Sequence, residues 1–222
     1  MTDGVFSMPL LVLGAGGHAR VVIEALRRLN AQIIGVADPG LPARAEGPFG
    51  IAVLGDDSAV SAQKTDEILL VNGIGSLPAS RARRDAFEKF SAQGYEFATV
   101  IHPNAFIADG VAVGEGVQVM AGAVIQPGAV IGVNVIINTR ASIDHDCQIG
   151  QGVHVAPGAT LSGGVQVGDH AHVGAGAVVI QSVTLGEKSV VGAGAVVVRD
   201  VEAGETVASP AARPLNQTSS RS

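Results

Sequence analysis

Residues 143–161 read IDHDCQ IGQGVH VAPGAT L, with Ile, Val or Leu at the head of each group of six. The same register continues without a break from Ile107 to Val197, and the residue four places further on is always Val, Ala, Cys or Ser. A strict period of six in short β-forming segments is typical of a hexapeptide β-helix. The sequence therefore predicts a three-sided prism, in which each coil has three short strands and the large aliphatic residues point inward.

The period of six also assigns a place to each residue that is not aliphatic. The fourth position of the hexad is mostly Gly, and it is Asn or Asp in three hexads, at Asn134, Asp146 and Asp200. Residues of these types tolerate the left-handed backbone that a sharp corner needs. His170 falls at such a corner, which favours a structural role. Cys147 falls in the small inward position, which predicts a buried thiol and not a nucleophile.

The outward positions differ between the faces of the prism. One face stacks mostly apolar residues or small hydroxyl residues, namely Val124, Ser142, Thr160, Val178 and Val196. Apolar residues that point away from a filled core indicate a contact surface. This face is therefore predicted to be a subunit interface.

The first hundred residues show a different pattern, in which apolar strands alternate with helices. Strands are expected over residues 10–13, 33–37, 51–54, 67–72 and 95–101, with helices after residue 17 and over residues 80–90. The alternation predicts a small parallel sheet, about half of a doubly wound, Rossmann-like domain. We expect an α/β domain over residues 1–102, a β-helix domain over residues 103–215 that leaves the prism after residue 197 to form a cap, and a disordered tail over residues 216–222.

Composition excludes several classes of function. The net charge of −6 leaves no basic surface for nucleic acid. The single cysteine excludes an internal disulfide framework and fits a reducing cytosol. The sequence has no apolar run of membrane-spanning length and no signal-peptide pattern, which predicts a cytoplasmic protein.

A glycine-rich loop, Gly14-Ala15-Gly16-Gly17-His18, lies between a predicted strand and a predicted helix. Such loops direct backbone amides and a helix N-terminus at phosphate. Asp38 ends the second strand, where an acid can bind a ribose hydroxyl, and Gly75 follows another strand of the same sheet. These features favour a nucleotide crevice over a tight turn without a ligand. His18 fits either a phosphate donor or a helix cap.

His145 lies at the third hexad position, beside a corner, where other hexads carry polar residues that face solvent. The fold does not need a histidine there, and a near-neutral imidazole suits a general base. The neighbouring Asp144 and Asp146 can orient the ring or raise its basicity. Asp146 also fits a simple corner residue. The residue pattern alone leaves a catalytic and a structural role open for His145 and Asp146.

His154 and His172 are expected to stack on adjacent coils of one face, because they are 18 residues apart in the same register. Two stacked histidines suggest a metal site, but no third ligand in a suitable register is evident. Ligand contact or interface packing is therefore favoured, and no metal is predicted.

Together these features resemble the family of bacterial sugar O-acyltransferases and nucleotide-aminosugar N-acetyltransferases. The resemblance covers residues 9–215. It rests on the glycine loop that ends in Gly17-His18, the junction Ile101-His102-Pro103 and the hexapeptide helix, which is left-handed in that family. Its most specific part is the run IDHDCQIG at residues 143–150, followed by His154. The closing run Val207-Ala208-Ser209-Pro210-Ala211 is similar to the family's Gly-x-Pro-Ala ending, with Ala208 in place of Gly.

The resemblance implies a homotrimer with acetyl-CoA between neighbouring prisms. It implies that His145 is the general base and that Asp146, which stands where relatives often have the longer Glu, tunes that base. It implies acetyl-CoA contacts for His154 and Gly163, and a nucleotide-sugar pocket at Gly16, Gly17, His18, Asp38 and Gly75. The implied reaction is direct transfer of acetyl from acetyl-CoA to the amino group of a nucleotide-linked amino sugar, of the UDP-4-amino-sugar or GDP-perosamine type.

Two other functions are compatible with the same residues. One is O-acetylation of a sugar such as sialic acid, which shares the scaffold. The other is a non-catalytic nucleotide- or NAD-binding protein, suggested by the pattern G-x-G-x-x-A. The α/β half is short for a full dinucleotide fold together with a substrate site, which favours the transferase. The sequence leaves the sugar, the nucleobase and the acetylated position open.

Overall fold

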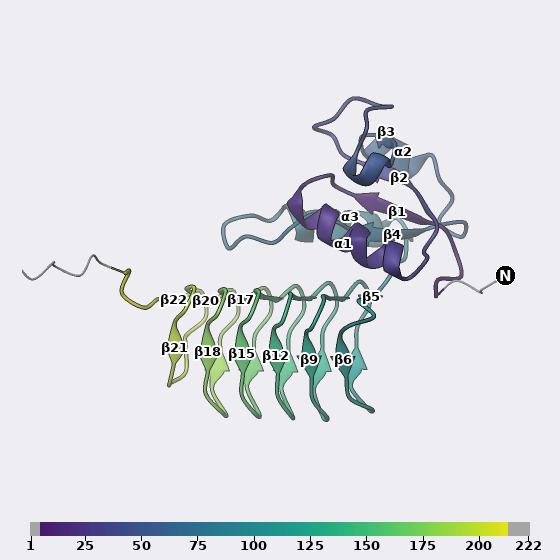
Figure 1. Cartoon of the computed structure of the whole chain (residues 1–222). Helices are drawn as coiled ribbons and strands as arrows, with labels where there is room; N and C mark the ends of the chain where they lie inside the picture. Colours follow the sequence, from purple (N-terminus) through teal and green to yellow (C-terminus); the bar gives the residue numbers. More distant parts are fainter. Residues whose placement is uncertain (1–4, 213–222) are drawn as a thin grey trace, which may run out of the picture.

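The computed structural model describes residues 5–212 and places an α/β domain over one side of a long β-helix (Figure 1). The elements of the α/β domain are β1 (Leu10–Leu13), α1 (Gly17–Arg28), β2 (Ile33–Ala37), η1 (Pro48–Gly50), β3 (Val53–Gly55), α2 (Asp57–Ser61), β4 (Leu69–Asn72) and α3 (Ala82–Ala92). Its four parallel strands are ordered β3-β2-β1-β4. The strand order reverses at β1, and a crevice is expected at the carboxyl ends of the strands around such a point.

The β-helix contains three parallel sheets, each built from two-residue strands. The five-stranded sheet contains β7 (Ala112–Val113), β10 (Val130–Ile131), β13 (Gln148–Ile149), β16 (Gln166–Val167) and β19 (Thr184–Leu185). The six-stranded sheet contains β6 (Phe106–Ile107), β9 (Val124–Ile125), β12 (Ser142–Ile143), β15 (Thr160–Leu161), β18 (Val178–Val179) and β21 (Val196–Val197). The seven-stranded sheet contains β5 (Val100–Ile101), β8 (Gln118–Val119), β11 (Ile136–Ile137), β14 (His154–Val155), β17 (His172–Val173), β20 (Val190–Val191) and β22 (Thr206–Val207).

The interior of the prism follows the period of six. From Val119 to Val197 every hexad aliphatic is at most 5% exposed, and Cys147 is fully buried in the same core. The corner residues Asn134, Asp146 and His170 have left-handed backbones, with φ of 55°, 58° and 59°. The predicted architecture, inward register and corners are therefore confirmed.

The two ends of the prism differ from the sequence-based expectation. Residues 95–101 do not form a strand of the α/β sheet: Phe97 makes one bridge to Leu70, and β5 pairs with β8. At the other end the chain stays in the prism after residue 197, because β22 pairs with β20. Both outcomes satisfy backbone groups that would otherwise be unpaired at the ends of the seven-stranded sheet. The predicted tail at residues 216–222 lies outside the described residues.

The α/β domain covers the seven-stranded sheet of the prism. Gln118 and Ile136 point outward from this sheet, yet both are fully buried. The loop between β4 and α3 reaches over the following coils, where His154 of β14 bonds to the carbonyl of Ser76. One face of the prism is thus an internal domain interface, while the six-stranded and five-stranded sheets face outward. No helix in residues 5–212 has the length and apolarity needed to cross a membrane.

Candidate active site

His145 and Asp146 form a hydrogen-bonded pair on one edge of the prism. The edge lies between β12 of the six-stranded sheet and β13 of the five-stranded sheet. Asp146 Oδ2 lies 2.8 Å from His145 Nδ1, and a carboxylate only accepts, so Nδ1 carries the proton and donates. The hydrogen bond to Asp146, together with the charge of Asp144, raises the pKa of His145 above its ordinary value. Nε2 is left as the basic atom of an exposed imidazole.

The position of the His145 ring depends on Gly163, which lies on the next coil. A Cβ at position 163 would collide with His145 Nε2 and Cε1. The next residue, Gly164, donates its N–H to the His145 carbonyl at 2.8 Å and ties the two coils together. The absence of a side chain at Gly163 therefore leaves room for the imidazole and keeps Nε2 open. Although Asp is shorter than Glu, Asp146 reaches the His145 ring.

The glycine loop and Asp38 lie at the carboxyl ends of β1 and β2. Asp38 Oδ2 accepts from Ala15 N at 2.7 Å, and its Oδ1 accepts from Gly40 N at 2.8 Å, so the carboxylate braces the loop. Gly16 and Gly17 are exposed, and a Cβ at either would meet no atom within 4 Å. The first amides of α1 lack partners within their helix, as at any helix N-terminus. A cavity of about 400 Å³ opens beside Gly14 and Asp38.

His18 lies in the first turn of α1 and points down toward the prism. Gln118 Nε2 donates to the Asn72 carbonyl at 2.8 Å, so Gln118 Oε1 accepts from His18 Nε2 at 2.7 Å. This leaves Nδ1 of His18 as an acceptor. Burial and the nearby Arg83 lower the pKa of His18 to about 4. The neutral ring cannot offer a positive charge to phosphate, and α1 has no side-chain cap. Gly75 packs against His18, where a Cβ would lie 3.4 Å from the His18 Cβ.

His154 is held from both sides of its ring. Its Nδ1 donates to the Ser76 carbonyl at 3.0 Å, and its Nε2 accepts from Asn138 Nδ2 at 3.1 Å. Its ring packs edge-on against the ring of His172, with 4.9 Å between the two ring centroids, as the 18-residue spacing predicts. Burial, followed by the neighbouring His172, lowers the pKa of His154 to about 4. His154 is therefore a neutral, oriented ring and not an acid–base group near pH 7.

The predicted residues fall into two groups on different sides of the prism. His145, Asp146 and Gly163 share one edge, whereas His18, Gly75 and His154 lie in the layer between the seven-stranded sheet and the α/β domain. In a three-sided prism the edge between the five-stranded and six-stranded sheets is opposite the seven-stranded sheet. One chain therefore does not bring its two groups together.

Three polar residues of the buried layer were not predicted from the sequence. Gln118 has an outward register that suggests solvent, Asn72 ends an apolar strand, and Arg83 lies on a helix whose arginines are expected to be exposed. Arg83 is 4% exposed and donates to the carbonyls of Asn72 and Ile74 at 2.7 and 2.9 Å. Its burial lowers its pKa to about 9. Among residues 5–212, no three His, Cys, Asp or Glu side chains gather in a way that would hold a metal ion.

The fold and these residues define a hexapeptide-repeat transferase with an added N-terminal domain. Residues 9–90 match the family model described as the PglD N-terminal domain. Residues 98–133 and 128–163 match the bacterial transferase hexapeptide, and residues 164–199 match the hexapeptide repeat of succinyl-transferase. No curated protein matches the sequence.

Solved structures resemble the chain over nearly its whole length. A variant of perosamine N-acetyltransferase from Caulobacter crescentus, in complex with CoA and GDP-perosamine, is 36% identical with a TM-score of 0.84, covering 92% of this chain and 95% of that one. The acetyltransferase domain of PglB from Neisseria gonorrhoeae FA1090 is 36% identical with a TM-score of 0.83, covering 94% and 100%. WeeI from Acinetobacter baumannii AYE is 28% identical with a TM-score of 0.76, covering 91% and 97%.

The chain belongs to the family of these hexapeptide-repeat sugar N-acetyltransferases, which confirms the resemblance noted in the sequence and with it the left-handed β-helix. It is thus an acyltransferase.

Proposed function

We propose that this chain transfers acetyl from acetyl-CoA to the amino group of a nucleotide-linked amino sugar, in a site that two subunits of a homotrimer complete. The observation that carries the proposal is the separation of the two groups within one chain. A general base at one edge of the prism and a nucleotide crevice above the opposite face make a site only when a second copy supplies the missing half. Relatives that bind CoA together with GDP-perosamine support this choice of substrates.

The assembly that we propose places the six-stranded sheet at the interface. Its outward residues include Phe106, Val178 and Val196, which are 55%, 37% and 63% exposed in a single chain. Exposed apolar side chains in one stack favour burial against another copy. A closed threefold ring would set the His145 edge of each prism beside its neighbour. Val178→Asp should then lower the trimer fraction measured by light scattering, and an intact trimer would place the interface elsewhere.

The proposed chemistry uses His145 as the base. Acetyl-CoA supplies the acetyl group as a thioester. His145 Nε2 accepts a proton from the attacking amine as the new C–N bond forms. His145 then gives this proton to the departing sulfur of CoA when the C–S bond breaks. Asp146 keeps the proton of Nδ1 in place, so that Nε2 stays free, and general-base help of this kind contributes about 10²–10⁴ in rate. Gly163 of one copy and His154 of its neighbour are assigned to acetyl-CoA, and His154 offers only its ring edge because both of its nitrogens are bonded within the chain.

The proposed nucleotide site is the crevice at β1 and β2. The amides of Gly16 and Gly17 at the start of α1 bind the diphosphate, since a helix N-terminus favours anions. Asp38 binds the ribose through lone pairs that Ala15 and Gly40 leave free, because a carboxylate accepts about four hydrogen bonds. His18 contacts the nucleotide sugar as a neutral acceptor through Nδ1, and Gly75 leaves room for it. A cytoplasmic location, where acetyl-CoA is made, completes the proposal.

Mixing two inactive variants tests the shared site. His145→Ala removes the base, and Gly16→Glu places a negative charge beside the proposed diphosphate at a position where a Cβ meets no atom within 4 Å. Each variant alone should be inactive. Trimers formed by refolding an equal mixture should regain about a quarter of wild-type activity, because a site needs an intact base from one copy and an intact crevice from its neighbour. An inactive mixture of correctly assembled trimers would show that each chain carries its own complete site.

A substrate panel tests the chemistry. We expect turnover of acetyl-CoA with a UDP- or GDP-linked amino sugar and none with sialic acid. Turnover with sialic acid alone would instead establish the O-acetyltransferase. Binding of a nicotinamide dinucleotide without any transfer would favour the non-catalytic alternative.

A further inference from the structure

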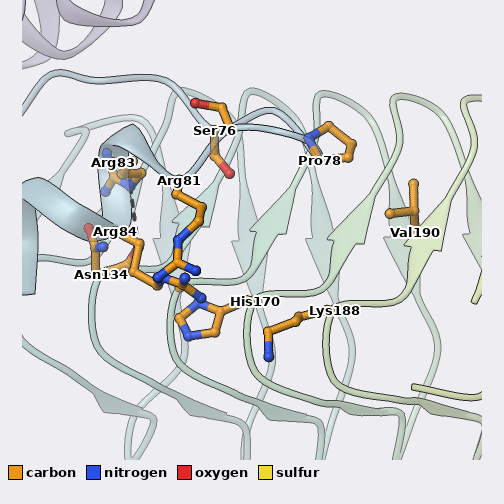
Figure 2. Close-up of a pocket in the computed structure, with 11 residues that line it drawn as sticks. Ser76, Pro78, Arg81, Arg83, Arg84, Asn134, His170, Lys188 and Val190 are labelled. Carbon is orange, nitrogen blue, oxygen red and sulfur yellow. Dashed lines mark hydrogen bonds between the residues drawn. The ribbon is translucent and has the colours of Figure 1, made fainter. Parts of the chain in front are cut away.

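A second polar cavity, of about 210 Å³, lies away from the candidate active site (Figure 2). It opens between the start of α3 and the prism edge that joins the five-stranded and seven-stranded sheets. Its lining includes Ser76, Ser80, Arg81, Arg84, His170 and Lys188. It shares no residue with the cavity at Gly14 and Asp38, and it contains none of the residues assigned to catalysis.

Positive charge gathers at this cavity in a protein whose net charge is −6. Figure 2 shows the side chains of Arg81 and Arg84 reaching toward the His170 ring, with Lys188 on the next coil. The acidic partners of these cations, Asp85, Glu88 and Glu187, do not line the cavity. The lining of the cavity therefore contains basic side chains and no carboxylate.

The arginines of the cavity lie at the start of α3, where the helix dipole disfavours positive charge. Arg81 is the N-cap of α3, and Arg83 and Arg84 lie in its first turn. The N-terminus of a helix carries partial positive charge, and a like charge there costs about 0.3–1 kcal/mol. A bound anion would turn this repulsion into attraction for the dipole and the side chains together.

The charges on the prism occupy strained corners. His170 and Lys188 have φ of 59° and 56°, and other coils have Gly116 and Gly152 in the same column. A residue with a Cβ in this conformation costs roughly 1–2 kcal/mol. Two unfavourable arrangements, on separate parts of the chain, thus converge on one cavity.

Two buried guanidinium atoms beside the cavity make no hydrogen bond in the described residues. They are Nη2 of Arg83 and Nε of Arg84, and the latter lies 3.6 Å from Glu88 Oε1 in an ion pair. Arg83 is itself 4% exposed, lines the cavity and has no carboxylate bonded to it. The carbonyls of Asn72 and Ile74 accept hydrogen bonds from Arg83 but bring no negative charge, and an oxyanion is the group that arginine binds best.

We infer that this cavity binds a phosphate group of a small molecule. Arg81, Arg84 and Lys188 supply charge, Ser76 and Ser80 supply hydroxyl donors, and Pro78 and Val190 leave an apolar end for the organic part of the ligand. The inference does not depend on the proposed acetyl transfer.

Calorimetric titration of the intact protein with inorganic phosphate and pyrophosphate, at an ionic strength fixed with chloride, tests the inference. Wild-type protein should bind pyrophosphate saturably. Lys188→Gly should weaken this binding about tenfold, while relief of corner strain keeps the variant at least as stable as the wild type. Arg140→Gly is the matched control: it removes one positive charge and replaces a non-glycine residue at a left-handed corner, with φ of 58°, at a different edge. It should leave the binding unchanged.

A second variant and a second readout guard against an effect on folding. Arg84→Gln should weaken pyrophosphate binding as Lys188→Gly does. Bound phosphate should also raise the pKa of His170, followed by NMR, because the anion counters the burial and the Arg84 charge that now lower it. Equal binding by wild-type protein and Lys188→Gly, or no saturable binding at all, would overturn the inference.

Steady-state kinetics of Lys188→Gly show which molecule supplies the phosphate group. If Lys188→Gly also raises the apparent KM for acetyl-CoA or for the nucleotide sugar, the phosphate belongs to that substrate. If it weakens pyrophosphate binding alone, the site serves a separate phosphorylated metabolite.

Discussion

His145 lies at the corner between β12 and β13, and His154 lies nine residues further on in β14 of the same coil, yet the two histidines have opposite properties. His145 lies on an exposed edge, where Asp146 raises its pKa. His154 lies under the α/β domain, where burial lowers its pKa to about 4. His145 is therefore suited to accept a proton near pH 7, and His154 is suited to remain neutral in a fixed orientation.

The difference shows how a regular prism assigns chemistry by face. A hexad position places a side chain at an edge or on a face, and the neighbouring domain then determines whether that face meets water. The buried layer contains His18, Gln118, Asn72 and Arg83 as one hydrogen-bonded network that fixes the crevice over the prism. The exposed edge contains the proposed base and its acid, and in the proposed assembly a second subunit completes the site.

The largest effect on activity is expected from removing the imidazole of His145, the proposed base. We expect His145→Ala to lower kcat about 10²–10⁴-fold, because only that imidazole offers a free basic nitrogen at the edge. The measurement is steady-state acetyl transfer, with gel filtration to show that assembly is retained. His154→Gln is the companion variant, and it should lower kcat much less because His154 is not a proton acceptor. Equal losses in the two variants would contradict the division of roles.

The next largest effect on activity is expected from adding a methyl group beside the proposed base. Gly163→Ala should lower kcat about 50-fold, because the new Cβ occupies the position of His145 Nε2 and Cε1 and turns the ring away. Gly158→Ala on the same coil is the control for activity, since a Cβ there meets no atom within 4 Å, although the φ of 69° lowers the stability of this variant by about 1–2 kcal/mol. Wild-type kinetics in Gly163→Ala would show that the ring position is not critical.

The buried layer predicts a loss of stability in acid. His18 and His154 have pKa values of about 4 in the folded chain, against an ordinary value of 6.5. The unfolded chain therefore binds more protons between these values, so their contribution to stability is complete above pH 6.5 and is lost as the pH falls toward 4. At pH 5 the expected loss is about 2 kcal/mol for each histidine. Urea unfolding at pH 7 and pH 5 measures it, and His18→Gln should lose about half of the pH dependence.

The sequence predicted the prism because a core of identical stacked hexads leaves only one register for its aliphatic residues. The same register correctly placed Cys147 in the core, His170 at a corner and His154 beside His172. It could not predict that Gln118 is buried, since that depends on where the α/β domain docks. Arg83 was missed for the same reason: its burial is compensated by carbonyls that come together only in three dimensions.

The strand assignments failed where local pattern and tertiary pairing disagree. Residues 95–101 have the alternation of a sheet strand, but the open end of the seven-stranded sheet captures β5. The candidate base and its acid could be suggested from the run IDHDCQIG, yet the position of the two groups of candidate residues on different sides of the prism was visible only in the structure.

The smallest expected effect separates the charge of Asp146 from its shape. Asn tolerates the same corner, as Asn134 shows with φ of 55°, and its side-chain oxygen can still accept from His145 Nδ1. Asp146→Asn should therefore keep the ring in place and remove only the negative charge. Because that carboxylate raises the pKa of His145, the acid limb of the kcat/KM profile should move to lower pH, and the plateau should fall about tenfold as the base weakens. Asp144→Asn, which removes a charge without a bond to the ring, should move the limb less. A plateau that falls without any shift of the limb would mean that Asp146 orients His145 and does not set its basicity.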